Sequence, residues 1–411
     1  GNIADEGVTI DGDGDLTLLG NGADLGGLPV DADASNGDVT VEVNDTFGAG
    51  TIDVANYTGV DTLDIANGAG GTINVDNLQS DMTVEVSSNL GANNLEFGTA
   101  NTDTLDLDLT TVAANIGNVV DGDNNLQTVN ITADMGANGN INDLQLGAVQ
   151  SLNIDVASGE TLDVADGGPA LNGRAGSAGD RSIDINVTGG GTAEFNNGIA
   201  TGTDIDSLNV DVSGSLDLST NGIDVGNISP GGVVSLTGSG NYTNIADISL
   251  AAGQNNLTVE LATDEALTID DLGNSNVLND TLTLDSSNGD GAHVIENATV
   301  NFTDGSTLAL QGDQDLEIGN TTALDLSSSG DTNSAEIDAS NLSGALTADL
   351  TRGNTGTSND ENTVKVGTGD TTLNIDAAAN TNVNDDSFLF EFQQDGIGTV
   401  EIANYASTDA D

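Results

Sequence analysis

Three aspartates near the start of the chain stand at alternate positions around two glycines, in the segment DGDGDL (residues 11–16). They are Asp11, Asp13 and Asp15. Calcium takes about 6–8 oxygen ligands, from carboxylates and from backbone carbonyls that glycine turns expose. A helix–loop–helix calcium loop would need a glutamate at its twelfth position, where Gly22 stands. The spacing therefore leaves two interpretations open, a calcium site or a solvated acidic turn.

A second candidate lies in VDGDNN (residues 120–125), where Asp121 and Asp123 flank a glycine. It offers fewer carboxylates than the first candidate, and in so acidic a chain such pairs also arise by chance. We predict it as a weaker calcium site.

Residues suited to catalysis are scarce. The chain has no cysteine and one histidine, His293, for which we expect a structural role. A lyase that acts on acidic polysaccharide would need a basic proton acceptor or charge clamp. Arg174 and Arg181 are the candidates, although a plain surface loop explains them more simply. We predict that the chain is not an enzyme.

The charge balance limits the classes of molecule that the chain could bind. The formal net charge is −63, from 67 acidic residues against four lysines and arginines. Such self-repulsion favours expansion unless salt or bound cations screen it. Nucleic acid is excluded as a partner because almost nothing can neutralise its phosphates. Insertion into a membrane is also not expected, since no apolar run approaches the ~18 residues of a membrane span.

Short runs of alternating apolar and polar residues recur along the whole chain, which is the sequence signal of a β-strand. Their shared hexamer is apolar, polar, Thr or Ser, apolar, Asp or Asn, apolar. It occurs at 60–65, 126–131, 149–154 and 205–210. Turn residues separate the runs at spacings near 8–12 residues, half or a third of a solenoid coil. Aromatic residues, at 2%, are too few for a thick globular core, and small aliphatic residues suit thin stacked layers. We predict an all-β, elongated parallel β-solenoid, with serial β-sandwich domains as the alternative.

The repeats divide the chain into three parts. We expect strand arrays at 1–166 and 182–411, with a loop or boundary at 167–181, where the alternation stops. SFLFEF (387–392) is expected to form a terminal cap strand. The segment 110–120 could form a short helix, although Gly117 and its β-branched residues weaken that prediction.

Several segments resemble known extracellular proteins. TGVDTLDI (58–65) resembles the recurrent strand of bacterial surface-layer proteins and of large adhesins exported by the type I route. IDASNLSGALTADL (337–350) and DDSFLFEFQQDGIGTVEIANY (385–405) are similar to stretches of the same proteins. The resemblance implies an extracellular, calcium-dependent protein of the β-roll kind that assembles into a sheet or coat. The calcium-binding nonapeptide of that family is nowhere intact, so its ligands cannot be transferred to this chain.

These observations lead to one functional expectation. We expect a secreted structural protein that self-assembles into a surface layer, filament or matrix, with calcium or other cations bridging its acidic faces. Its partners would be copies of itself and cell-surface polysaccharide. The alternatives are an adhesin stalk and a β-helix polysaccharide lyase.

Overall fold

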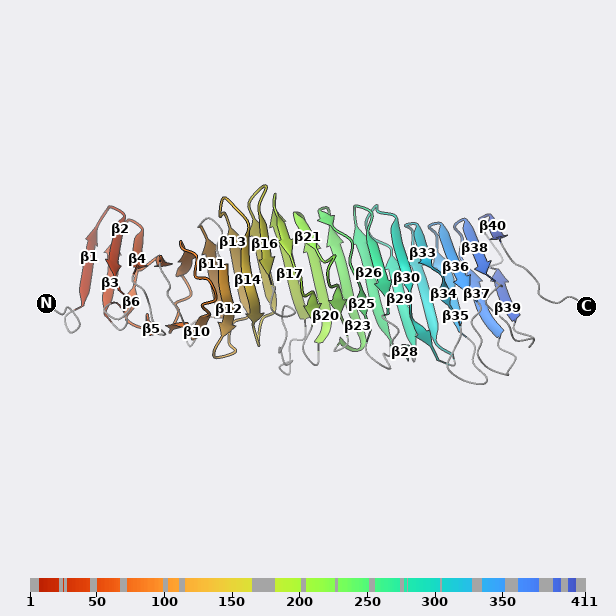
Figure 1. Cartoon of the computed structure of the whole chain (residues 1–411), viewed down its shortest axis with the longest axis horizontal. Coiled ribbons are helices and arrows are strands. Elements are labelled where there is room, and N and C mark those ends of the chain that lie inside the picture. The colour runs from red at the N-terminus through yellow and green to blue at the C-terminus, as the bar shows by residue number, and fades with distance from the viewer. Residues whose placement is uncertain are drawn as a thin grey trace, which may run out of the picture. The chain divides into compact units, whose positions relative to one another are not determined.

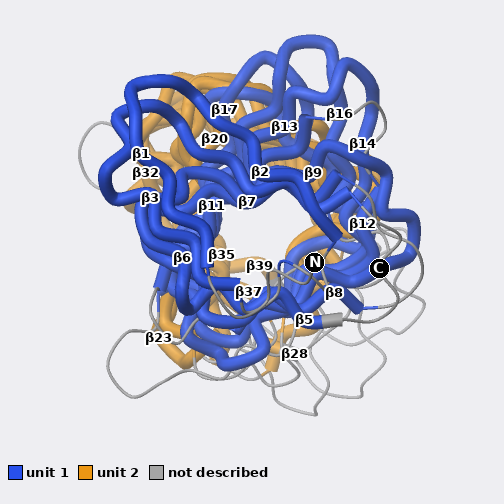
Figure 2. The backbone as a smooth tube through the Cα atoms, turned by 90° about the vertical axis from the view of Figure 1, so that its left-hand side faces the viewer, with its two compact units in different colours: residues 1–203, 213–216 blue, residues 204–212, 217–411 orange. Residues whose placement is uncertain are grey.

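The structure is a computed structural model of residues 1–411. It describes residues 7–21, 25, 28–44, 50–66, 72–98, 103–110, 115–164, 182–200, 205–225, 228–250, 256–273, 277–278, 280–303, 305–326, 335–351, 361–376, 387–392 and 398–403. The chain divides into unit 1 (residues 1–203 and 213–216) and unit 2 (residues 204–212 and 217–411). Figure 1 shows the strands in chain order, and Figure 2 separates the two units by colour.

The fold is an all-β parallel solenoid, as the sequence predicts, and the sandwich alternative is wrong. Strands of successive coils pair in parallel and in register, for example β13 (Thr128–Ala133) with β15 (Ser151–Val156). Among the described residues only Leu25 has helical backbone geometry. Antiparallel sandwiches would instead pair neighbouring strands through hairpins.

Unit 1 has two long sheet faces and a short one. The first face comprises, in spatial order, β2 (Leu16–Gly20), β4 (Val39–Val43), β7 (Thr62–Ile65), β9 (Thr83–Val86), β11 (Thr104–Leu109), β13, β15 and β17 (Ser182–Gly189). The second comprises β5 (Gly50–Asp53), β8 (Ile73–Asp76), β10 (Leu95–Gly98), β12 (Asn115–Asp121), β14 (Gly139–Gln145), β16 (Thr161–Val164) and β18 (Thr192–Glu194). The short face comprises β1 (Val8–Gly12), β3 (Val30–Ser35) and β6 (Tyr57–Thr58), and the remaining strand is β19 (Ile199–Ala200).

Unit 2 also has two long sheet faces and several short strands. Its first face comprises β20 (Ile205–Val212), β23 (Ile228–Gly238), β26 (Leu257–Thr263), β29 (Thr281–Ser286), β32 (Thr307–Gly312), β35 (Glu336–Leu342), β37 (Glu361–Val366) and β39 (Ser387–Phe392). Its second comprises β22 (Ile223–Asp224), β25 (Ile248–Ser249), β27 (Thr268–Leu272), β30 (His293–Ala298), β33 (Leu316–Thr322), β36 (Leu346–Thr351), β38 (Thr371–Asp376) and β40 (Val400–Ala403). The short strands are β24 (Asn241–Tyr242), β28 (Val277–Leu278), β31 (Asn301–Phe302) and β34 (Leu324–Asp325), and β21 (Ser215–Asp217) lies at the division between the units.

The core forms because strand residues alternate between the interior and the surface. Each hexamer places its second and third apolar residues inside the coil. The eight predicted core residues are at most 1% exposed, which confirms the prediction: Leu63, Ile65, Val129, Ile131, Leu152, Ile154, Leu208 and Val210. Each stacks on an equivalent residue of the next coil, so one coil buries the apolar face of its neighbour.

The outward positions of unit 1 are also stacked. On the first face, Asn130 donates to Asp106 at 2.6 Å, Asn153 donates to Asn130 at 2.6 Å, and Asn186 donates to Asn153 at 2.6 Å. These four half-buried side chains form an amide ladder. Its steps give the coil length as 24 and 23 residues, and 33 where residues 165–181 intervene.

The predicted loop or boundary at 167–181 lies between two strands that pair with each other. It lies outside the described residues, but β15 and β17 on either side of it pair in register, with Leu152 opposite Ile185. The division into compact units falls near residue 204. The helix considered for 110–120 is wrong for its described part, since 115–121 forms β12. Gly117 is needed there because a Cβ would lie 2.7 Å from the Ala92 carbonyl oxygen.

Candidate cation-binding sites

The first predicted site, Asp11, Asp13 and Asp15, lies around the turn between β1 and β2, where all three side chains are exposed. Asp13 Oδ1 accepts a hydrogen bond from Asn36 Nδ2 at 2.7 Å. Asp15 Oδ1 accepts one from the backbone N–H of Asp38 at 3.1 Å. These two carboxylates therefore attach the turn to the following coil.

The structure separates the two residues of the second predicted site. Asp121 ends β12 and faces the interior with 4% exposure, where its Oδ2 accepts a hydrogen bond from Leu126 N–H at 3.0 Å. Asp123 lies beyond the turn at Gly122 and is exposed. Positions i and i+2 share a face only within a continuous strand. Because β12 ends at Asp121, the spacing no longer brings the pair together.

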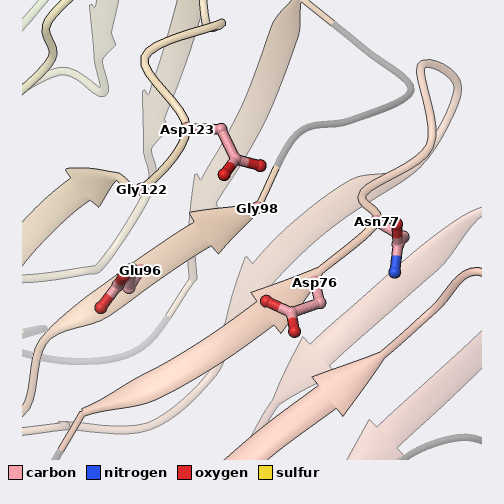
Figure 3. Close-up of a pocket in the computed structure, with 6 residues that line it drawn as sticks. All are labelled: Asp76, Asn77, Glu96, Gly98, Gly122 and Asp123. Atoms are coloured by element: carbon pink, nitrogen blue, oxygen red, sulfur yellow. The ribbon is translucent and has the colours of Figure 1, made fainter.

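Asp123 instead joins an acidic pocket on the second face of unit 1. Its lining residues are Asp76, Asn77, Glu96, Gly98, Gly122 and Asp123 (Figure 3). We call this set the acidic pocket. β8, β10 and β12 supply it because these adjacent parallel strands end at the same edge of the sheet. Asp76 and Glu96 are the residues that sequence reasoning missed.

Glycine keeps the acidic pocket open. A Cβ on Gly98 would lie 3.0 Å from Asp76 Oδ1 and 3.6 Å from Asp123 Oδ2, so carboxylates from two coils flank the backbone between them. A Cβ on Gly122 would lie 3.0 Å from Glu96 Oε1. Nearby, Asn77 Nδ2 donates to Asp53 Oδ1 at 2.8 Å.

The donors of the acidic pocket are the hard oxygen ligands that calcium prefers. Their spacing is looser than that of a closed metal site: among the described residues, no three acidic or histidine side chains converge closely enough to hold a metal ion. The pocket therefore fits calcium in ligand type but does not present a complete ligand set.

A second acidic feature lies on the first face of unit 1. Glu42 of β4 is in register with Asp64 of β7, Asp64 with Glu85 of β9, and Glu85 with Asp108 of β11. We call these four residues the carboxylate column. Adjacent strands are about 4.8 Å apart, so like charges face each other directly.

The surroundings raise the pKa values of two members of the column. For Asp64, 9% exposed, burial is the main cause, with the negative charges of Glu85 and Glu42 adding to it and a hydrogen bond from Ser87 at 2.5 Å opposing it. For Asp108, burial again raises the pKa, a hydrogen bond from Thr132 lowers it, and Glu85 raises it. The carboxylate column therefore holds like charges close together, and binding of a proton or a cation would reduce their repulsion.

Replacing Asp64 with Asn is expected to stabilise unit 1 at neutral pH. The amide keeps an oxygen for Ser87 but removes the charge between Glu42 and Glu85. Two opposed like-charge pairs disappear, and we expect a gain of roughly 0.5–1 kcal/mol in the free energy of unfolding. Urea-induced unfolding followed by circular dichroism measures it.

The pH dependence of this gain has a definite sign. The folded chain binds the Asp64 proton more readily than the unfolded chain, because the folded-state pKa is raised. Protonation of Asp64 therefore removes its repulsion of Glu42 and Glu85 as pH falls through that pKa. The difference in the free energy of unfolding between Asp64→Asn and the parent should shrink over the same pH range. Asp155→Asn is the matched control, since its in-register neighbours are Thr132 and Thr188. An equal gain in both variants would contradict the column's role.

Of the four basic residues and the histidine, the structure describes Lys365 and His293. Arg174, Arg181 and Arg352 lie outside the described residues. Lys365 Nζ lies 2.7 Å from Glu336 Oε1 and 3.6 Å from Asp338 Oδ2. His293 is 1% exposed, and burial lowers its pKa, although the backbone of Leu261 opposes the shift. Burial therefore favours the neutral form of this imidazole.

Comparisons with known proteins identify no family and no relative for this chain. No protein family, no curated protein and no solved structure matches the chain. Within the described residues, no helix has the length and apolar character needed to cross a membrane.

Proposed function

We propose that this chain is a secreted, non-catalytic structural protein that self-assembles into a surface layer, extracellular filament or matrix. In this proposal it works at the cell surface, and cations bridge its acidic faces. The carboxylate column is the observation that carries the proposal. Stacking alone aligns its like charges, and lysine and arginine are too few to offset them. Burial is the main cause of the raised pKa values of Asp64 and Asp108, and the negative charge of Glu85 adds to it at both residues.

Calcium is the cation that we propose, and the acidic pocket is its best candidate site. Asp76 and Asp123, whose carboxylates flank Gly98, would supply oxygens from two coils, and water would complete the ligand shell. A cation between them would link these coils and so favour the folded stack. We propose copies of the same chain as the main partner and cell-surface polysaccharide as a second one.

Calcium removal is expected to lower the melting temperature at constant ionic strength. A ligand that binds only the folded state at 100 times its Kd adds about 2.7 kcal/mol. For a domain of this size, such a gain in the free energy of unfolding corresponds to a rise of roughly 5–10 °C in the melting temperature. Chelator titration with matched sodium, followed by thermal melting and light scattering, measures both stability and assembly.

The control for calcium is a pair of variants. Asp76→Asn with Asp123→Asn should reduce the calcium-dependent shift, whereas Asp155→Asn should leave it unchanged. Melting and scattering that respond only to total salt would show that screening, not calcium, supports the fold. The structural role would then stand without the assigned cation.

The enzymatic alternative has weaker support. A lyase acting on acidic polysaccharide needs a positive group near the substrate. The lining residues of the acidic pocket are acidic, amide or glycine, and they would repel such a substrate. An adhesin stalk remains the second candidate, because a solenoid can also hold a separate binding tip away from a surface.

A further inference from the structure

One interior position of unit 2 departs from the pattern of the coils around it. Successive coils enter the second face of this unit with the segments EALTI (265–269), GAHVI (291–295), QDLEI (314–318) and GALTA (344–348). The third residue of each segment is Leu267, His293, Leu316 and Leu346, so a histidine stands where the neighbouring coils have leucine. A position that breaks the local rule of a repeat is a candidate for a functional role.

The strand register places His293 in an apolar interior column. His293 of β30 is opposite Leu316 of β33. On its other side the neighbour is Leu267, which directly precedes Thr268, the in-register partner of Val294. His293 and Leu267 are each 1% exposed, and Leu316 is 2% exposed. The imidazole therefore occupies a leucine position between two leucines.

The polar atoms of this imidazole are not satisfied in the folded coil. Both ring nitrogens of His293, Nδ1 and Nε2, are buried and have no hydrogen-bond partner among the described residues. The backbone of Leu261 is near enough to oppose the effect of burial on the pKa of His293, but it makes no hydrogen bond of ordinary geometry with either nitrogen. Burying an unpaired polar group costs free energy, and burying its charged form costs far more.

The acidic residues around His293 lie on outward positions of the described coils. On the strands packed against β30, and on β30 itself, they are Glu260 of β26, Asp270 and Asp271 of β27, Asp285 of β29, Glu296 of β30, Glu317 of β33 and Asp325 of β34, all half-buried or exposed. In the adjoining turns they are Asp264, Glu265, Asp290, Asp313 and Asp315, all exposed. Protonation of His293 would therefore place a positive charge in the interior with no carboxylate turned inward to pair with it.

We propose that His293 is an acid-sensitive switch inside unit 2, and that a proton on its imidazole opens the coil that contains β30. The neutral ring packs in the column as the leucines do. The protonated ring has two N–H donors and a charge, which the interior does not satisfy but water does. The open coil therefore binds the proton more tightly than the closed coil. This inference goes beyond the proposed function and holds whether or not copies of the chain assemble.

The sign of the pH dependence follows from the burial of His293. Burial lowers the pKa of this residue in the folded chain, whereas an imidazole in the unfolded chain has a pKa of about 6.5. The contribution of His293 to stability is therefore complete above about pH 6.5 and is lost as pH falls towards the folded-state pKa. Burial raises the pKa values of Asp247 and Asp270 in the same unit, so protonation of these carboxylates acts in the opposite direction. The test must separate His293 from them.

An NMR titration of the parent measures the first part of the proposal directly. The chain has one histidine, so its imidazole gives a single, unambiguous signal. We expect the folded-state signal to titrate below the ordinary value of about 6.5, and the signal of the open coil to grow as pH falls. A folded-state midpoint at or above that value would overturn the proposal, since the interior would then accept the charge.

Hydrogen exchange measures the opening itself. Between about pH 7.5 and pH 5.5, the protection factors of the β27, β30 and β33 amides should fall by up to about tenfold, because one extra proton on the open coil changes the opening equilibrium about tenfold per pH unit. His293→Leu restores the residue of the neighbouring coils and should abolish this fall. Glu317→Gln, on an outward position of β33, keeps the imidazole and should behave like the parent. Constant ionic strength and correction for intrinsic exchange rates complete the comparison.

Unit 1 has no histidine and provides an internal control in the same molecule. If the β13 and β15 amides lose as much protection as those of β27, β30 and β33, acid acts on the whole chain and the inference is wrong. If the parent and His293→Leu lose protection equally, other groups govern the response and the inference is again wrong. If His293→Leu fails to fold, the NMR titration and the comparison of the two units in the parent decide the question.

Discussion

Leu152→Asp is expected to unfold unit 1. Leu152 is 0% exposed and lies between Val129 and Ile185 of the adjoining coils. The aspartate would place a charge in an apolar interior with no basic partner, and it would also remove the packing of a leucine. We expect a loss of at least about 4 kcal/mol in the free energy of unfolding, measured by urea titration.

The same strand provides the controls for this variant. Leu152→Met keeps the volume and apolar character, so it should cost less than about 1.5 kcal/mol. Asp155, three residues later, is an aspartate that the outward face of β15 already accommodates. If Leu152→Asp and Leu152→Met unfold at the same urea concentration, the interior assignment of this position is wrong.

Gly369→Ala is expected to disrupt unit 2 for a steric reason. Gly344, Gly369 and Gly398 occupy the same corner in successive coils. A Cβ on Gly369 would lie 1.9 Å from the carbonyl oxygen of Gly344, and one on Gly398 would lie 2.6 Å from that of Gly369. These are backbone atoms, which cannot rotate away, so the coils would have to separate. We expect a loss of about 3 kcal/mol, measured by thermal and urea unfolding.

Gly14→Ala is the matched control for the corner glycines. A Cβ on Gly14 would meet no atom within 4 Å. Its replacement should change the free energy of unfolding by less than about 0.5 kcal/mol, or stabilise the chain by restricting the unfolded state. Equal melting of the two alanine variants would mean that the coils are not in close contact at the corner.

The fold could be predicted from the sequence because its determinants are local. Alternation within each hexamer is enough to assign Leu152 and Ile154 to the interior, and scarce aromatic residues favour thin coils over a globular core. For residues 115–121 the strand is harder to predict, because the position of Gly117 against the turn of the preceding coil is not visible in the local sequence. That contact joins residues about one coil apart.

The candidate sites depend on register between coils, which the sequence does not show directly. Asp64 and Glu85 look unremarkable in their own strands, and they become opposed charges only when coil lengths are known. Coil length varies, and residues 165–181 lengthen one step of the amide ladder to 33 residues. The sequence contains one feature that could identify Asp76 and Glu96 as site residues: each lies near the end of an alternating run, just before a turn. Asp121 faces the interior and Asp123 faces solvent because β12 ends at Asp121.

The amide ladder also bears on how such a chain can change over generations. Asn130 and Asn153 occupy equivalent positions on adjoining strands, with Thr128 opposite Ser151 and Ala133 opposite Val156. Excising or duplicating the residues from one position to its equivalent would reconnect strands of the same kind. Each coil contacts mainly its two neighbours, so the rest of the stack would keep its contacts. Replication slippage over one repeat therefore yields a shorter or longer protein in a single genetic event, and length becomes a quantity on which selection can act without redesigning the core.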